Sequence, residues 1–261
     1  MAKRRLKFKY RKVLNILIFV FALLCIGMAI YSIINIINWK KDVDENEKVQ
    51  EKMENIITTI EPIEDENQEE QEVKYYIDFQ LLKETNEDTI AYIKVNNTNI
   101  DYIIVKGEDN SYYLKHNFEK KWNVAGWIFA DYHNKFDESD KNIIIYGHNT
   151  KDGSMFGTLK KILNNDWYEN EDNYKIVLVT ENGAYYYQVF STYTIKPEDY
   201  YINTEFKNND EFDKFIKKLK SRSIYDYKVE VSGEDKILTL SSCIGDGTKR
   251  VVLHAKLIEN A

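Results

Sequence analysis

Cysteine is scarce in this sequence, with only two residues among 261. A single pair cannot build the disulfide framework typical of small exported domains. One of the two, Cys25, lies inside a long apolar run near the N-terminus, which leaves Cys243 as the only thiol in the rest of the chain. Cys243 therefore has no partner there for an intrachain disulfide, and an unpaired thiol outside the cytoplasm is a liability unless it is buried or used.

Motifs that bind cofactors are also missing. The chain has ten glycines and two prolines, and they form neither a glycine-rich phosphate loop nor a dinucleotide fingerprint. No group of histidines and cysteines has the spacing of a metal site, and no internal repeat is present. We therefore expect neither a cofactor nor a bound metal.

Charge is absent from residues 13–39, which are mostly Ile, Leu, Val, Phe and Ala. About 20 apolar residues in a helix are enough to cross the hydrocarbon core of a bilayer. A cleaved signal peptide would have an apolar region of roughly 7–15 residues that ends in small residues. This run instead continues through Ile33, Ile34, Ile36 and Ile37. We therefore expect an uncleaved transmembrane signal anchor.

The residues before the apolar run set its expected orientation. Residues 1–12 carry seven basic side chains and no acid, so the positive-inside rule places them in the cytoplasm and the rest of the chain on the extracellular face of the cell membrane. Beyond this tail, 29 cationic residues stand against 43 acids, a net charge near −14. Such a charge argues against nucleic acid as a partner.

Four segments follow from these patterns. We expect a cytoplasmic tail at 1–12, a transmembrane anchor at 13–39, an amphipathic helix with an acidic linker at 40–74, and a folded domain at 75–261. The helix is indicated by apolar residues at helical spacing, which are Val49, Met53, Ile56, Ile57 and Ile60.

Short apolar runs separated by turn residues recur through the folded domain, which favours a closed or nearly closed barrel. The expected strands are 90–95, 100–105, 126–130, 142–146, 175–180, 184–195, 228–231, 237–240 and 251–257. Two helices are expected, at 78–85 and 209–222. The fold class is thus mostly β, with about eight barrel strands and a few peripheral helices after one N-terminal transmembrane helix.

Cys243 is expected where one strand ends, before a turn rich in glycine. A side chain there is held by the strand behind it and faces a loop in front, so it can be both rigid and reachable. Arg250 begins the returning strand, where its guanidinium can favour a thiolate or bind a developing oxyanion. The alternative is that Cys243 is a small buried apolar residue, as most lone cysteines are.

One of the four histidines is expected at a comparable place. His148 follows the buried-looking run 142–147, so it too is presented at the end of a strand. A Cys and a His that face each other form the minimum set for acyl transfer through a thioester. His254 lies inside the last strand and is interpreted as structural, whereas His116 and His133 lie in loop segments with nothing convergent nearby.

These residues together resemble a sortase. The resemblance rests on the string Thr239-Leu-Ser-Ser-Cys243, on Arg250 in the next strand and on Tyr146-Gly-His148-Asn149 upstream. The signal anchor and the segments 99–105, 110–114 and 153–157 fit the sortase family as well. The late helix and the N-terminal helical segment resemble class B sortases in particular. The likeness covers roughly residues 75–257 and implies a sortase-like closed barrel.

What the resemblance implies is a membrane-anchored cysteine transpeptidase of a Gram-positive cell wall. Such an enzyme cleaves a C-terminal sorting signal of an exported protein through a thioester, and an amine of the peptidoglycan cross-bridge or of lipid II then takes the acyl group. The resemblance implies Cys243 as nucleophile, His148 as general acid and base, and Arg250 as oxyanion or substrate-positioning group. It places Ser241, Asn149 and Thr239 in the substrate groove.

The chain departs from the class B pattern in the short, glycine-rich link at 245–247, which includes Asp246. Asp246 either orients His148 or simply makes a turn. Two alternatives to a transpeptidase stay open: a cysteine peptidase that hydrolyses the same kind of signal, and a non-catalytic membrane-tethered β-domain.

Overall fold

The computed structural model describes residues 2–54, 56–60, 74–244 and 248–260, and within these ranges it describes 2–9, 54, 58–60, 74, 243–244 and 259–260 by backbone alone. The chain divides into two compact units, residues 1–44 and 45–261.

Helix α1 (Ala2–Glu54) contains the apolar run. Among the described residues it is the one helix long and apolar enough to cross a membrane, as judged by length and composition. Its large apolar side chains from Val13 to Ile37 are exposed, which suits a helix that could cross a membrane. The predicted long apolar helix is therefore confirmed.

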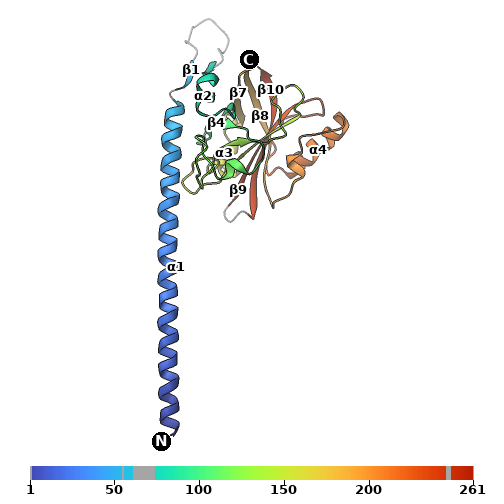
Figure 1. Cartoon of the computed structure of the whole chain (residues 1–261). Helices are drawn as coiled ribbons and strands as arrows, with labels where there is room; N and C mark the ends of the chain where they lie inside the picture. The colour runs from blue at the N-terminus through green and yellow to red at the C-terminus, as the bar shows by residue number, and fades with distance from the viewer. Residues whose placement is uncertain (1, 55, 61–73, 245–247, 261) are drawn as a thin grey trace. The chain divides into compact units, whose positions relative to one another are not determined.

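The second unit is built on a closed barrel of eight strands, in the order β10-β8-β7-β3-β4-β5-β6-β9 (Figure 1). The strands are β3 (Thr89–Val95), β4 (Asp101–Val105), β5 (Phe129–Ala130), β6 (Asn142–Gly147), β7 (Lys175–Thr180), β8 (Gly183–Ile195), β9 (Ile237–Ile244) and β10 (Lys249–Asn260). Two pairs are parallel, β4 with β5 and β6 with β9, and the others are antiparallel. The predicted closed barrel is confirmed.

Smaller elements surround the barrel. They are the two-stranded ribbon of β1 (Ile57–Ile60) and β2 (Lys74–Ile77), helices α2 (Phe79–Thr85), α3 (Asn165–Tyr168) and α4 (Asn209–Arg222), and the 3₁₀ turns η1 (Tyr112–Leu114), η2 (Leu159–Leu163), η3 (Glu171–Tyr174) and η4 (Tyr200–Ile202). Helix α4 has the predicted bounds because Asn208 caps its start, where the side chain of Asn208 accepts a hydrogen bond from Glu211 N at 2.9 Å.

Side chains alternate between two cores along the barrel strands. Ile145, Leu240 and Leu253 point inward and join the main apolar core. On the outside, α4 lies against the side of the barrel (Figure 1), and apolar residues of α4 and of β8, β9 and β10 are buried together there. This second core includes Tyr193, Tyr201, Phe212, Ile216, Leu219, Ile237 and Val252. The outer face of β8, β9 and β10 is therefore also dry over part of its length.

A buried polar chain crosses that outer face. The hydroxyl of Thr239 donates to Asn142 Oδ1 at 2.7 Å, so it accepts from His254 Nδ1 at 2.9 Å. His254 Nε2 then accepts from the hydroxyl of Tyr193 at 2.9 Å. A neutral His254 satisfies every bond in this chain, and its ring has no exposed surface. Its structural role agrees with the sequence interpretation.

The end of α1 belongs to the second unit. Val49 and Met53 are buried in the main core, and Asn46 is hydrogen-bonded to Asn123 and Gly126. The compact unit thus begins at Glu45, well before the start at residue 75 that the sequence suggested.

Three local expectations were wrong. Residues 228–231 form no strand, and Val229 instead packs against the core while its carbonyl accepts from Lys220. Residues 57–60 pair with β2 as a strand, so the predicted amphipathic helix ends before them. Strand β5 holds only Phe129 and Ala130 of the expected run 126–130.

Burial of His254 predicts a pH-dependent stability. Desolvation lowers the pKa of His254 to about 3, against 6.5 for an ordinary histidine. The unfolded chain therefore binds more protons below pH 6.5, and stability falls as the pH drops from there towards 3. At 1.36 kcal/mol per pH unit, the free energy of unfolding should fall by about 2 kcal/mol between pH 6.5 and 5. Urea denaturation of the detergent-solubilised chain at both pH values checks this, and His254→Gln should remove most of the difference. An equal pH dependence in both proteins would contradict the assignment.

Candidate active site

Two of the predicted catalytic residues lie on neighbouring parallel strands. In the pairing of β6 with β9, Tyr146 is opposite Ser241 and Gly147 is opposite Ser242. His148 directly follows β6, and Cys243 is the next residue of β9, so the backbone brings them to the same level at the same edge of the sheet. Parallel neighbours lie about 4.8 Å apart in the direction of their hydrogen bonds.

The third predicted residue lies on the other side of Cys243. Strand β10 pairs antiparallel with β9, and in this register Arg250 is directly opposite Cys243. Directly opposed residues point to the same face of a sheet, and the Cβ atoms of such a pair are about 5 Å apart. The backbones of β6, β9 and β10 therefore bring positions 148, 243 and 250 side by side.

The imidazole of His148 is held by a main-chain group. Its Nε2 lies 2.8 Å from the carbonyl oxygen of Leu114, at the end of η1. Because a carbonyl only accepts, Nε2 carries a hydrogen in this geometry and Nδ1 is the nitrogen available to take up a proton. The ring is half-buried.

Close packing explains why a glycine precedes His148. A Cβ added to Gly147 would lie 2.5 Å from Ile128 Cδ1 and 2.6 Å from Phe156 Cγ. After the strand, Phe156 N donates to the carbonyl of His148 at 2.9 Å, which ties the following loop back to the strand end. His148 is thus fixed from both sides.

A buried carboxylate lies behind the site and was missed by the sequence analysis. Asp131 accepts from the hydroxyl of Tyr146 and from Asn110 Nδ2, both at 2.8 Å, and from the backbone and ring nitrogens of His133. Burial raises the pKa of Asp131, but these hydrogen bonds outweigh it and leave the pKa below its ordinary value. Tyr146 has the opposite shift, because burial and the charge of Asp131 raise its pKa while the charge of Arg250 lowers it.

Alternation along β6 could have indicated Tyr146, since it lies two residues before His148 and so shares its face. No local pattern indicates Asp131, which follows β5 and reaches Tyr146 only through the pairing of β5 with β6. The expectation that nothing convergent lies near His133 was wrong, because His133 bonds to Asp131.

The predicted groove residues differ in exposure. Ser241 is buried, and its hydroxyl lies 2.9 Å from that of Tyr201 in η4. Asn149 is half-buried, and its Oδ1 has no hydrogen-bond partner within the described part of the chain. Thr239 has no exposed surface and is bonded to Asn142 and His254. Thr239 therefore bonds within the sheet and has no exposed surface for a substrate to contact.

Asp246 and its neighbours at 245–247 lie outside the described residues. Among the residues that are described, no group of three or more His, Cys, Asp and Glu side chains could hold a metal ion.

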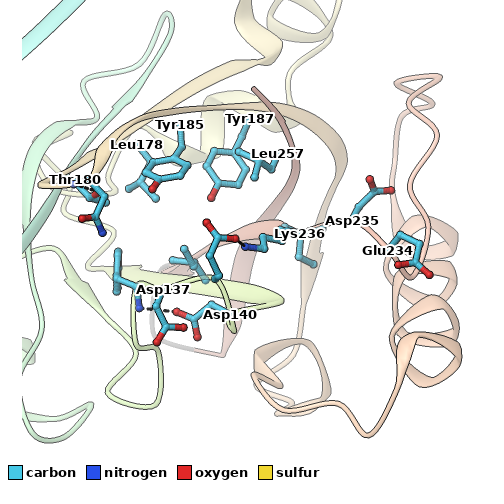
Figure 2. Close-up of a pocket in the computed structure, with 15 residues that line it drawn as sticks. Asp137, Asp140, Leu178, Thr180, Tyr185, Tyr187, Glu234, Asp235, Lys236 and Leu257 are labelled. Atoms are coloured by element: carbon cyan, nitrogen blue, oxygen red, sulfur yellow. Dashed lines mark hydrogen bonds and ion pairs between the residues drawn. The ribbon is translucent and has the colours of Figure 1, made fainter. Parts of the chain in front are cut away.

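A cleft of about 650 Å³ lies elsewhere on the barrel (Figure 2). It is lined by residues at the starts of β6 and β9, among them Ile143 and Ile237, whereas the predicted catalytic residues lie at the ends of these strands. Tyr185 and Tyr187 are among its lining residues (Figure 2), and Lys236 and Glu138, which also line it, form an ion pair. The cleft is therefore separate from the candidate active site.

The fold and the site define a class of protein: closed mixed β-barrels that carry a cysteine and a histidine at the ends of adjacent parallel strands. A family model for the sortase domain matches residues 93–258. The chain is 40% identical over 184 residues to sortase B of Listeria monocytogenes, covering 68% of this chain and 72% of that protein.

Solved structures agree with this match. Sortase B of Bacillus anthracis in complex with AAEK1 superposes with a TM-score of 0.72 at 34% identity, covering 84% of this chain and 99% of that one. The Staphylococcus aureus sortase B–substrate complex has a TM-score of 0.65 at 34% identity, covering 69% and 84%. This chain belongs to the sortase family, whose members are transpeptidases that anchor proteins to the cell wall.

The packing around Gly147 predicts the effect of one added methyl group. In Gly147→Ala the new Cβ meets the buried ring of Phe156, and overpacking of this kind costs about 1–3 kcal/mol of unfolding free energy. Urea denaturation measures the loss. Gly107→Ala is the matched control, because its Cβ would meet Tyr113 at an ordinary 3.4 Å and should cost much less. Equal losses in the two variants would show that close packing does not fix position 147.

Proposed function

We propose that this chain is a membrane-anchored cysteine transpeptidase that cleaves a C-terminal sorting signal of exported proteins through a thioester and transfers them to an amine of cell-wall peptidoglycan. The observation that supports this most is the register of β6, β9 and β10, which brings positions 148, 243 and 250 together. Membership of the sortase family supports the same reaction class.

In the first half of the reaction, His148 Nδ1 takes the proton of the Cys243 thiol, and the sulfur attacks the carbonyl carbon of the sorting signal. Strand alternation puts position 243 on the same face as Ser241 and Arg250, so the guanidinium of Arg250 faces the oxyanion that forms. When the tetrahedral intermediate collapses, the C–N bond breaks and His148 gives its proton to the leaving amine. The product is a thioester on Cys243.

In the second half, the peptidoglycan or lipid II amine attacks the thioester carbonyl. His148 takes the proton of the amine, a new amide bond forms, and the sulfur leaves as thiolate. The hydrogen bond from His148 Nε2 to Leu114 holds the ring in one orientation and stabilises the imidazolium that forms in each half. The reaction needs no cofactor or metal.

The peptide groove is proposed to run along the outer face of the strand ends. Ser241 sets its floor together with Tyr201, to which it is bonded. The buried Oδ1 of Asn149 is available to accept a hydrogen bond from a substrate amide, since it has no partner among the described residues.

The proposed topology keeps the basic tail 1–12 in the cytoplasm, the segment 13–39 of α1 in the membrane and the barrel on the extracellular face. It is supported by the length and hydropathy of α1 and by the seven basic residues before the apolar run.

Substitution of the nucleophile should abolish the covalent intermediate. Incubation of the detergent-solubilised chain with a pentapeptide library, followed by mass spectrometry of the protein, should show acyl adducts that disappear in Cys243→Ala. Retention of full transpeptidation by Cys243→Ala would remove the cysteine from the mechanism.

Loss of the guanidinium should slow the reaction without disabling the thiol. Removing one oxyanion donor lowers kcat by about 10²–10³-fold, and we expect this of Arg250→Ala. Arg250→Lys should recover only part of the rate, because an ammonium lacks the planar fork of donors. Labelling of Cys243 by a methanethiosulfonate reagent checks that the thiol still reacts. An unchanged kcat in Arg250→Ala would exclude the oxyanion role.

Product analysis separates transfer from hydrolysis. With an added oligoglycine or diaminopimelate-type amine, a transpeptidase should form an amide product at the expense of the free acid. A product mixture that stays entirely hydrolytic at every amine concentration would indicate a cysteine peptidase instead.

A further inference from the structure

Large side chains stand exposed on the segment between β4 and β5. Trp122 is 61% exposed, Val124 45% and Tyr112 37%. Together with Lys115 and His116 they form what we call the aromatic patch. Clusters of exposed apolar side chains of this size usually mark a site where another molecule binds. The patch therefore indicates an interaction surface.

The residues of the aromatic patch are held in place by contacts with one another. The rings of Tyr112 and His116 stack at 3.9 Å, and His116 meets Trp122 edge-on at 5.7 Å. The backbones of His116 and Trp122 pair as an isolated β-bridge, and Lys115 Nζ lies 5.5 Å from the centre of the Trp122 ring. These contacts hold the indole outward in a defined position.

The patch is attached to the chain close to the apolar run. Asn123, the neighbour of Trp122, is hydrogen-bonded to Asn46 at 2.9 and 3.3 Å, and Asn46 also donates to Gly126 O at 3.0 Å. Asn46 is only seven residues from Trp39, where the apolar run ends. Seven residues span about 10 Å as helix, and no more than about 25 Å when fully extended.

The chemistry of the patch fits the surface of a bilayer. Tryptophan and tyrosine combine an apolar ring with a polar edge and concentrate at the depth of lipid headgroups. Lys115 beside the indole can pair with a lipid phosphate, to which juxtamembrane cations are attracted. A protein partner would also cover apolar rings. The segment from Trp39 to Asn46 is short, however, so the aromatic patch stays close to the lipid-facing apolar run in any conformation of residues 40–45.

We propose that the aromatic patch inserts into the headgroup layer of the membrane that anchors the chain. The inference rests on the proposed membrane anchoring by 13–39 and adds a second contact. Leu114 lies in the same segment, and its carbonyl oxygen holds His148. A membrane contact at the patch would therefore hold the candidate active site at a fixed height above the lipid surface, within reach of a lipid-borne acceptor.

Tryptophan fluorescence of the full chain in nanodiscs tests this. Of the four tryptophans, Trp127 and Trp167 are buried, at 1% and 4% exposure, which leaves Trp39 and Trp122 as candidates for contact with lipid. Phosphatidylcholine brominated near the headgroup quenches only indoles that reach it. We expect quenching in the natural chain and a smaller quenched component in Trp122→Phe. Trp39→Phe should remove the other part of the quenching.

The two variants separate the proposals. Loss of all quenching in Trp39→Phe, with none that depends on Trp122, would overturn the membrane patch and leave the anchor intact. Absence of quenching from Trp39 itself would instead contradict anchoring by 13–39. Trp167→Phe is the matched control for removal of a tryptophan and should leave quenching unchanged. Thermal melting confirms that each variant is folded, as expected for the exposed Trp122.

Discussion

The pairing of β6 with β9 is the constraint on which the rest of the structure depends. The two strands are parallel and distant in sequence, so no tight turn fixes their alignment. Side-chain alternation does so instead: Ile145 and Leu240 fill the barrel, and Asn142 and Thr239 bond to each other on the outer face. A slip of one residue would exchange these faces and leave both sets in the wrong surroundings. The register that fills the core is therefore the register that brings Cys243 to His148.

The outer face of these strands has two regions of different character. Under α4 it is dry, and its polar groups form a closed chain from Asn142 through Thr239 and His254 to Tyr193. Buried polar groups cost stability unless every one is bonded, and this chain is complete with a neutral imidazole. Towards the strand ends the character changes, because Tyr146 is influenced both by the negative charge of Asp131, to which it is bonded, and by the positive charge of Arg250. The candidate active site therefore begins at the point where the outer face of the strands is no longer fully buried.

Much of the fold could be predicted from local patterns. The hairpin of β3 and β4, the long β8 and the bounds of α4 follow from alternation, turn residues and a capping asparagine. The strand predicted at 228–231 shows the limit, since alternating residues there pack as an irregular segment. Sequence patterns report which face of a segment is apolar, but not whether a partner strand is available.

The candidate site was only partly predictable for the same reason. The three predicted catalytic residues lie where apolar runs end or begin, and this local feature can be recognised in the sequence. They are Cys243, His148 and Arg250. Asp131 and Leu114 act through contacts that only the closed barrel creates. Asn149 was predicted from its place beside His148, and the structure adds that its buried Oδ1 has no hydrogen-bond partner among the described residues.

The contact between His148 and Leu114 has a consequence for how this site can vary. The acceptor is a main-chain carbonyl, which every amino acid supplies. Replacement of the Leu114 side chain leaves the acceptor in place, so a scan of side-chain substitutions would not reveal its contribution. Only a change in the path of the backbone, such as an insertion or deletion between β4 and β5, would remove it. The length of that connection is therefore under tighter constraint than the identity of the residue that supplies the oxygen.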